Sequence, residues 1–351
     1  MNKLFTTFKH IFSIEELKGR IFNTLLFLAF FRLGSYIALP GVDATKLTQT
    51  GDGGLFGLLN MFSGGALSNA SVFALGIMPY ISASIAIQLL TIALPYFQKM
   101  QKDGEAGRKK LNQITRILTI FVTAAQGFTY LQVTIPTEAI MVDPWFFRIY
   151  GVAILAGGTM LCMWLGEKIT DKGIGNGISM LIMVGIVSRF PSALIQEATS
   201  RGMSGALLFI VEVIALFFIV MGAVMVVQAV RRIPVQYAKQ VVGSTTSTVG
   251  GERQYIPLKL NASGVMPIIF AQALMFIPGL VAQSFADKSE FAQSVAQNFG
   301  DFTTWQYNAL FATLIILFTF FYTAISINPT QISDDMKRGG GFVPGIKPGE
   351  E

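Results

Sequence analysis

Apolar and polar residues follow one another along this chain in long blocks rather than in strict alternation. The apolar blocks are eight in number and cover residues 21–39, 71–94, 117–135, 149–166, 174–194, 205–229, 262–283 and 305–327. A helix of about 20 apolar residues spans the roughly 30 Å hydrocarbon core of a bilayer, whereas membrane strands alternate at every second residue. The pattern therefore predicts an all-α membrane protein with eight spanning helices.

Composition and charge agree with a membrane protein and give it an orientation. Hydrophobic residues make up 52% of the 351 residues and charged residues only 13%, too few to cover a soluble globule. Of the 26 Lys and Arg residues, 20 lie in the first twenty residues and in the loops expected on the same side. The positive-inside rule then places both ends in the cytoplasm. The net charge of +6 describes cytosolic loops and is no evidence for DNA binding.

The first twenty residues are expected to form a helix on the cytoplasmic surface. Residues 4–12 place their apolar side chains on one helical face, and Ser13 with Glu16 forms a capping-box pattern. A cleaved signal peptide is the alternative. The first span is long for that, carries Arg32 and lacks a small-residue cleavage site, so an uncleaved span is preferred.

Three regions break the pattern of spans: residues 55–67, residues 230–260 and the Gly- and Pro-rich last stretch from Asn328. Residues 55–67 form an apolar stretch that is too short to cross a membrane. Gly64 and Gly65 lie near its end, shortly before the second span. This indicates a half-helix folded back into a cavity or, alternatively, a helix resting on lipid. Residues 230–260 contain two β-prone runs around a Gly/Ser/Thr turn, which predicts a protruding hairpin. Its five basic residues would bind RNA phosphates or acidic protein, or would only set topology.

Residues for catalysis or metal binding are scarce. The chain has one cysteine, Cys162, and one histidine, His10, and its glycine runs lack the spacing of a phosphate loop. We therefore expect no enzyme, no cofactor and no metal. Five polar side chains within or near spans would line an aqueous path or join helices: Arg32, Gln88, Gln126, Glu212 and Gln272.

Three sequence strings together resemble the SecY family of protein-translocase channels. They are NMFSGGALS with FALGIMPYISASI, then MWLGEKITDKGIGNGIS, and finally NPTQISDDMKRGGGFVPGIKPGEE. The resemblance implies a SecY-type helical bundle of two inverted halves, with eight of the usual ten transmembrane helices present, so that the chain would be truncated. It divides the chain into a surface helix (1–20), an N-terminal half (21–194) and an incomplete C-terminal half (195–351) with cytoplasmic loops at 230–260 and 327–351.

The resemblance also assigns a plug and a pore ring. The plug is the stretch 55–67, with Leu55, Phe56, Leu58, Leu59, Met61, Phe62, Gly64 and Gly65 as its residues. The pore ring is a collar of aliphatic side chains, matching Ile77, Ile81, Ile182 and Ile269. Ordinary packing in lipid or core is the alternative for these isoleucines. The family's lateral gate would lie between spans 2, 3, 7 and 8.

The implied function is a channel subunit that moves unfolded polypeptides across the bacterial plasma membrane and releases transmembrane segments sideways into lipid. Implied partners are SecE and SecG, the SecA motor, the ribosome, a nascent chain with its signal sequence, and membrane lipid. The docking residues would be Arg231, Arg232, Lys239, Lys337, Arg338 and Lys347. The alternatives are an inverted-repeat transporter of small solutes and a docking protein without a pore.

Overall fold

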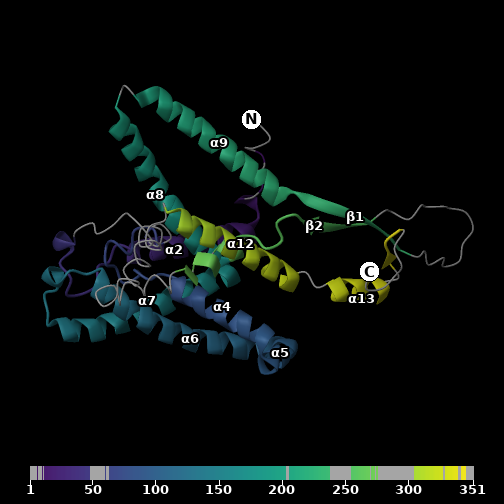
Figure 1. The fold of residues 1–351 in the computed structure, drawn as a ribbon, viewed down its shortest axis with the longest axis horizontal. Helices are drawn as coiled ribbons and strands as arrows, with labels where there is room; N and C mark the ends of the chain where they lie inside the picture. Colours follow the sequence, from purple (N-terminus) through teal and green to yellow (C-terminus); the bar gives the residue numbers. More distant parts are fainter. Residues whose placement is uncertain are drawn as a thin grey trace, which may run out of the picture. The chain divides into compact units, whose positions relative to one another are not determined.

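The structure is a computed structural model of the chain. It describes residues 6, 10, 12–47, 60, 63–202, 205–237, 254–268, 270–272, 274–275, 304–326, 329–338 and 341–344. Helices dominate these residues (Figure 1). They are α2 (Glu15–Gly34), α4 (Met78–Ala93), α5 (Pro95–Lys102), α6 (Gly104–Val133), α7 (Pro144–Lys172), α8 (Gly177–Arg201), α9 (Ala206–Gln228), α12 (Trp305–Ser326) and α13 (Pro329–Arg338), with 3-10 turns at Ala44–Lys46 and Thr137–Ala139.

The chain divides into two compact units, each built from two stretches of sequence. Unit 1 comprises Met1–Gln196 and Gln272–Ala309. Unit 2 comprises Glu197–Ala271 and Leu310–Glu351. The first break between the units therefore falls inside α8, near its end.

Five helices of the described residues are long and apolar enough to cross a membrane: α6, α7, α8, α9 and α12. Helices α4 and α5 together would supply a sixth, although they are bent by 99°. The predicted bounds 21–39 need correction, because the helix of this region, α2, begins at Glu15 and ends at Gly34. Helix α2 begins in a charged segment and ends at Gly34, so its apolar part from Ile21 is only about 21 Å long. Of the run 262–283, residues 269, 273 and 276–283 lie outside the described residues.

The predicted span at 71–94 is helical only in its later part. Helix α4 begins at Met78 with Pro79 in its first turn, where the missing N–H of proline costs nothing. The preceding residues form turns, and Gly76 has a φ of 52°, which a continuous helix does not allow. Residues 71–77 are thus irregular but almost entirely buried, as irregular backbone at membrane depth requires.

A proline also separates α4 from α5. Pro95 is the first residue of α5, and Leu94 before it is extended, with φ −114° and ψ 123°. A residue before proline avoids the helical region because its backbone would clash with the proline ring. The chain therefore turns by 99° at the point where the basic segment with Lys99 and Lys102 begins.

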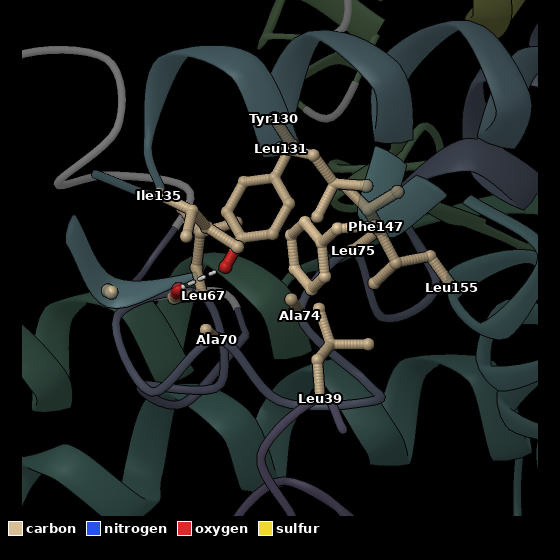
Figure 2. Packing of buried hydrophobic residues seen from close by; sticks show 11 residues of the cluster. Leu39, Leu67, Ala70, Ala74, Leu75, Tyr130, Leu131, Ile135, Phe147 and Leu155 are labelled. Atoms are coloured by element: carbon tan, nitrogen blue, oxygen red, sulfur yellow. Dashed lines mark hydrogen bonds between the residues drawn. The ribbon is translucent and has the colours of Figure 1, made fainter. Parts of the chain in front are cut away.

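The apolar core of unit 1 joins the turns before α4 to helices α6 and α7 (Figure 2). In this cluster the Tyr130 hydroxyl donates a hydrogen bond of 2.7 Å to the carbonyl oxygen of Leu67. The cluster consists of Leu39, Leu67, Ala70, Ala74, Leu75, Tyr130, Leu131, Ile135, Ala139, Phe147 and Leu155. It fixes the stretch 67–75 against two long helices.

Glycines on one side of α7 allow this close packing. A Cβ at Gly158 would overlap the carbonyl oxygen of Val72, and one at Gly151 would lie 2.8 Å from Leu131 Cδ1. A Cβ at Gly157 would meet nothing within 4 Å. In a membrane the hydrophobic effect does not favour contact between helices over contact with lipid. Small residues then help helices to pack, because they let the backbones approach closely.

A side chain caps the start of α7, whereas the cap predicted before α2 is wrong. Asp143 caps α7, and its carboxylate accepts hydrogen bonds from Trp145 N (2.9 Å) and Phe146 N (3.2 Å). The capping box expected from Ser13 and Glu16 does not form, because the N-cap residue of α2 is Ile14. Ser13 lies at the end of the preceding turn, and its hydroxyl donates back to the carbonyl of His10 at 2.7 Å.

Unit 2 combines apolar helices with a small sheet. Helix α9 has no buried residue in this chain, as expected for a helix that faces lipid. Strands β1 (Val230–Tyr237) and β2 (Gln254–Lys259) pair antiparallel, which confirms the predicted hairpin. A third strand, β3 (Gly341–Phe342), pairs with the end of β1 and gives the order β2-β1-β3.

Candidate functional site

Three of the four isoleucines assigned to the collar lie at the starts of two helices of unit 1. Ile77 is the N-cap residue of α4, and Ile81 lies one turn further along; both are buried. Ile182 is on the first turns of α8 and is half-buried. Ile269 lies outside the described residues. The structure therefore locates three of the four side chains.

Two of these isoleucines line one small cavity. The cavity measures about 20 Å³, enough for about one water molecule, and most of its lining is apolar. Besides Ile77 and Ile182, it is lined by Phe31, Ser63, Leu75, Gly76, Met78 and Leu181. Ser63 belongs to the stretch 55–67, which is called the plug segment from here on. The cavity thus brings together the start of α4, the start of α8 and the plug segment.

The described part of the plug segment is Asn60 and residues 63–67. The other assigned plug residues, Leu55, Phe56, Leu58, Leu59, Met61 and Phe62, lie outside the described residues. Asn60 is buried and organises the segment: its carbonyl accepts from Gly65 N at 2.9 Å and from Ser63 Oγ at 3.2 Å. Its side-chain oxygen accepts from Ser68 N at 3.2 Å. Local hydrogen bonds hold these residues as a compact turn.

Gly64 and Gly65 are buried at the centre of this turn. Their φ angles are +65° and +90°, a region that side chains rarely adopt. A Cβ at Gly64 would lie 3.0 Å from both Cα and O of Gly185 on α8. The glycines are therefore required by both the turn and its close approach to α8.

Three residues at the plug segment were not singled out for it by sequence reasoning. Tyr130 binds the carbonyl of Leu67, Arg189 lies beside Gly65, and Gly185 forms the wall against Gly64. Only Tyr130 carried a usable signal, because a hydroxyl in an apolar span needs a partner. The partners of Gly185 and Arg189 depend on how α8 packs, which sequence periodicity does not reveal.

Four of the basic residues assigned to docking lie on the sheet of unit 2 or on the helix directly before its third strand. Arg231 and Arg232 are neighbours on β1, so their side chains leave opposite faces of the sheet, and both are exposed. Lys337 and Arg338 end α13, directly before β3, and are also exposed. The β1 to β3 pairing therefore joins the loops 230–260 and 327–351. Lys239 and Lys347 lie outside the described residues.

The charged groups within spans are engaged in contacts. Glu212 on α9 accepts a hydrogen bond of 2.6 Å from Arg201 at the end of α8, which ties these two helices together. Arg32 donates to the carbonyl oxygen of Gly64 in the plug segment. In the described part of the chain, no group of three or more His, Cys, Asp or Glu side chains could hold a metal ion.

These features define a class of protein: a multi-pass helical membrane protein in which an irregular, glycine-containing segment packs against an apolar cavity between helices. The family model for SecY matches residues 71–351 of the chain. The protein translocase subunit SecY of Streptomyces coelicolor is 40% identical over 99% of this chain and 82% of its own length. That of Halalkalibacterium halodurans is 41% identical with the same coverage. The chain belongs to the SecY family.

Solved structures share the fold at low identity. One, described as the structure of a protein conducting channel, has a TM-score of 0.64 and 15% identity, and the match covers 95% of this chain and 79% of that one. A second, from work on the plug domain of SecY, has a TM-score of 0.60 and 16% identity, covering 95% and 78%. At this level of identity the likeness concerns the fold.

Family membership confirms the resemblance, the SecY-type all-α fold and a non-enzymatic protein-translocase channel subunit. It decides against the solute transporter and against a docking protein without a pore. The number of spans, the halves and the roles of individual residues stay predictions.

Proposed function

We propose that this chain lines the conduit of a protein translocase, with Ile77, Ile81, Ile182 and Ile269 as its constriction and the plug segment as its seal. The observation that carries this proposal is the cavity lined by Ile77, Ile182 and Ser63. Two collar residues from helices far apart in sequence and one plug residue face the same apolar space. Lipid-facing isoleucines would not meet in this way.

An apolar constriction suits a conduit for unfolded polypeptides. A collar of isoleucines wets poorly and offers no ligand that could replace the hydration shell of an ion. The same side chains yield around any passing residue, so the seal does not depend on the sequence of the substrate. An apolar segment of the substrate that leaves sideways into lipid gains about 25 cal/mol per Å² of apolar area buried.

The test is the resting ion conductance of bilayers that contain a translocase assembled with this chain. Replacing Ile77 and Ile182 with serine should raise it, because hydroxyls let water enter the constriction. Ile195→Ser is the matched control, since Ile195 lies on α8 but is 65% exposed. Wild-type conductance in the Ile77→Ser, Ile182→Ser double variant would refute the pore role of these residues.

We propose that the basic sheet of unit 2 is the docking surface for a ribosome or for the SecA motor. Support comes from the exposed Arg231 and Arg232 on β1 and the exposed Lys337 and Arg338 at the end of α13. A structure of similar fold, described as Sec61 in the canine ribosome-channel complex, adds to it. That structure has a TM-score of 0.54 and 18% identity, and the match covers 76% of this chain and 59% of that one. Exposed Lys and Arg attract RNA phosphates or acidic protein by a salt-dependent interaction.

Charge reversal tests this surface. Arg231→Glu with Arg232→Glu should weaken binding of ribosomes and of the motor at low salt, and Lys46→Glu, outside the sheet, should not. Equal binding by both variants at low salt would contradict the docking role.

The remaining proposals concern assembly and placement. We propose that the chain associates with SecE and SecG in the plasma membrane and that its N-terminus is cytoplasmic. The strongest support for the orientation is the distribution of Lys and Arg among the loops. The test of this orientation is to label a Ser13→Cys variant with a membrane-impermeant thiol reagent. The reagent should react from the cytoplasmic side of the membrane and not from the outside. Labelling from outside would overturn the orientation.

A further inference from the structure

Arg32 reaches from the end of α2 to the plug segment. Its Nη1 donates to the carbonyl oxygen of Gly64 at 2.7 Å, and its Nη2 donates to the Tyr36 hydroxyl at 2.6 Å. The guanidinium carbon lies 4.6 Å from the centre of the Tyr36 ring. Two hydrogen bonds and one ring contact therefore fix the orientation of this guanidinium.

Gly64 fits a slot between two helices. A Cβ at Gly64 would lie 3.0 Å from Arg32 Nη1 on one side and 3.0 Å from the backbone of Gly185 on the other. Its φ of +65° independently favours glycine. The hydrogen bond from Arg32 thus forms only while Gly64 sits in this slot.

The two ends of the described plug segment are held in different ways. Leu67 is buried in the apolar cluster and bound by the Tyr130 hydroxyl, so this end is part of the core. At Gly64 the contact with α2 is a single hydrogen bond from a charged side chain to a backbone carbonyl. Such a bond is stronger than one between neutral groups. Because it involves only a side chain of α2, it can break while the backbone of α2 stays in place.

We propose that Arg32 is a latch that positions the plug segment in its closed state. Release of the Gly64 carbonyl lets the chain rotate at Gly64 and Gly65, while Leu67 stays rooted in the core. This inference rests on the proposed function of residues 55–67 as a plug. It assigns to Arg32 the control of how often the plug leaves.

The first experiment compares arginine variants of α2. Arg32→Met removes the donor. Arg20→Met is the matched control because Arg20 lies on the same helix and, among the residues that the structure describes, its side chain pairs with Glu16 of that helix. Losing a hydrogen bond to a charged group should raise resting conductance by about tenfold or more. Arg32→Lys keeps the charge but cannot hold Gly64 and Tyr36 at once, so a smaller rise is expected.

The second experiment changes the slot rather than the arginine. Gly64→Ala should raise conductance, since its Cβ would press on Arg32 and Gly185. Gly175→Ala is the matched control: Gly175 also has a positive φ, +73°, but a Cβ there meets nothing within 4 Å. The pair separates backbone strain from loss of the slot. Tyr36→Phe is a milder variant that leaves both Arg32 and Gly64 in place and should raise conductance slightly.

A direct readout of plug position accompanies the conductance. Ser63 is buried, and Cys162 is the only cysteine of the chain, so Ser63→Cys in a Cys162→Ala background gives one reporter thiol. Its reaction rate with a water-soluble thiol reagent should increase in the Arg32→Met and Gly64→Ala variants. The rate should stay low in the Arg20→Met and Gly175→Ala variants.

The outcomes separate the latch from the pore. Higher conductance and faster labelling in the latch variants, with both controls unchanged, support the proposal. If Arg32→Met and Tyr36→Phe keep wild-type conductance and a protected thiol while Ile182→Ser leaks, the latch is overturned and the proposed function stands. If Ile182→Ser does not leak either, the proposed function fails and the latch fails with it.

Discussion

The buried hydrogen bond between Tyr130 and Leu67 allows a quantitative prediction. Tyr130 is 3% exposed, and its hydroxyl donates to the Leu67 carbonyl at 2.7 Å (Figure 2). The Tyr130→Phe variant keeps the ring and its packing but leaves the carbonyl oxygen without this donor in an apolar cluster. Removing one partner of a buried hydrogen bond costs about 1–3 kcal/mol, because the remaining group stays desolvated.

A matched variant shows what burial contributes. Tyr150 donates to the carbonyl of Pro40 at 2.8 Å, nearly the same length, but this bond is exposed. Water can replace the hydroxyl there, so Tyr150→Phe should cost only about 0.5–1.5 kcal/mol. The comparison therefore holds the chemistry of the bond constant and changes its environment.

The assay is the thermal unfolding midpoint of the purified protein in detergent, read by the loss of tertiary structure. With about 2–4 °C per kcal/mol for large domains, Tyr130→Phe should lower the midpoint by several degrees and Tyr150→Phe by less. Resting conductance should change less in Tyr130→Phe than in Arg32→Met, because Leu67 is also held by the apolar cluster. Equal midpoints for the two tyrosine variants would refute the argument that burial of the Leu67 carbonyl makes this bond important.

Two further predictions concern the contacts of α7. Gly158→Val should destabilise the protein by about 2 kcal/mol or more, because its side chain would overlap the Val72 carbonyl. Gly157→Val should be tolerated. The unfolding midpoints of the two variants test this, and equal midpoints would contradict the packing. Arg116 makes two hydrogen bonds to the carboxylate of Glu167, at 2.7 and 2.8 Å, but both side chains are partly exposed. Arg116→Met should therefore lower stability by no more than about 1 kcal/mol at low salt and by less at high salt, and a salt-independent loss would contradict an electrostatic origin.

Hydrophobic periodicity predicted the helices well where each run fills the bilayer. The runs at 205–229 and 305–327 match α9 and α12 within a few residues, because in these two helices the apolar residues and the helical residues nearly coincide. The run at 149–166 is much shorter than α7, which continues to Lys172. Hydropathy reports where the chain is apolar, whereas helical hydrogen bonding continues through polar residues until a cap or glycine ends it.

The start of the second span could not be found from hydropathy. Residues 71–77 are as apolar as the helix that follows, yet they form turns. Gly76 has a positive φ, Val72 packs against Gly158 of α7, and Phe73 packs against Gly34 of α2. Composition is the same for a lipid-exposed helix and for buried irregular backbone. Only the tertiary packing, such as the contact between Gly158 and Val72, distinguishes them.

The candidate site was predicted in its residue types but not in its contacts. The glycines of the plug segment and the isoleucines of the collar were identified through the SecY resemblance, and the structure places Ile77, Ile182 and Ser63 around one cavity. Arg32 was expected either to line a water path or to join helices. Its partner in the plug segment, the carbonyl oxygen of Gly64, has no signature in sequence because every residue carries a carbonyl.

The contrast between an apolar constriction and a polar latch has a mechanistic consequence. If apolar burial alone held the plug, a tighter seal would require more buried apolar area. The free energy needed to open the plug would then rise in proportion to that area. The hydrogen bond from Arg32 to Gly64 provides a separate contribution, of about 1.5–3 kcal/mol for a charged donor. If the total free energy of opening is of this size, the open state holds about 0.1–10% of molecules, and a modest preference of substrate for the open state is enough to shift the balance. Because Leu67 and Ala70 stay anchored in the core, the movement has to be absorbed on the N-terminal side of them, at Gly64 and Gly65, the two described plug residues whose backbone tolerates the change.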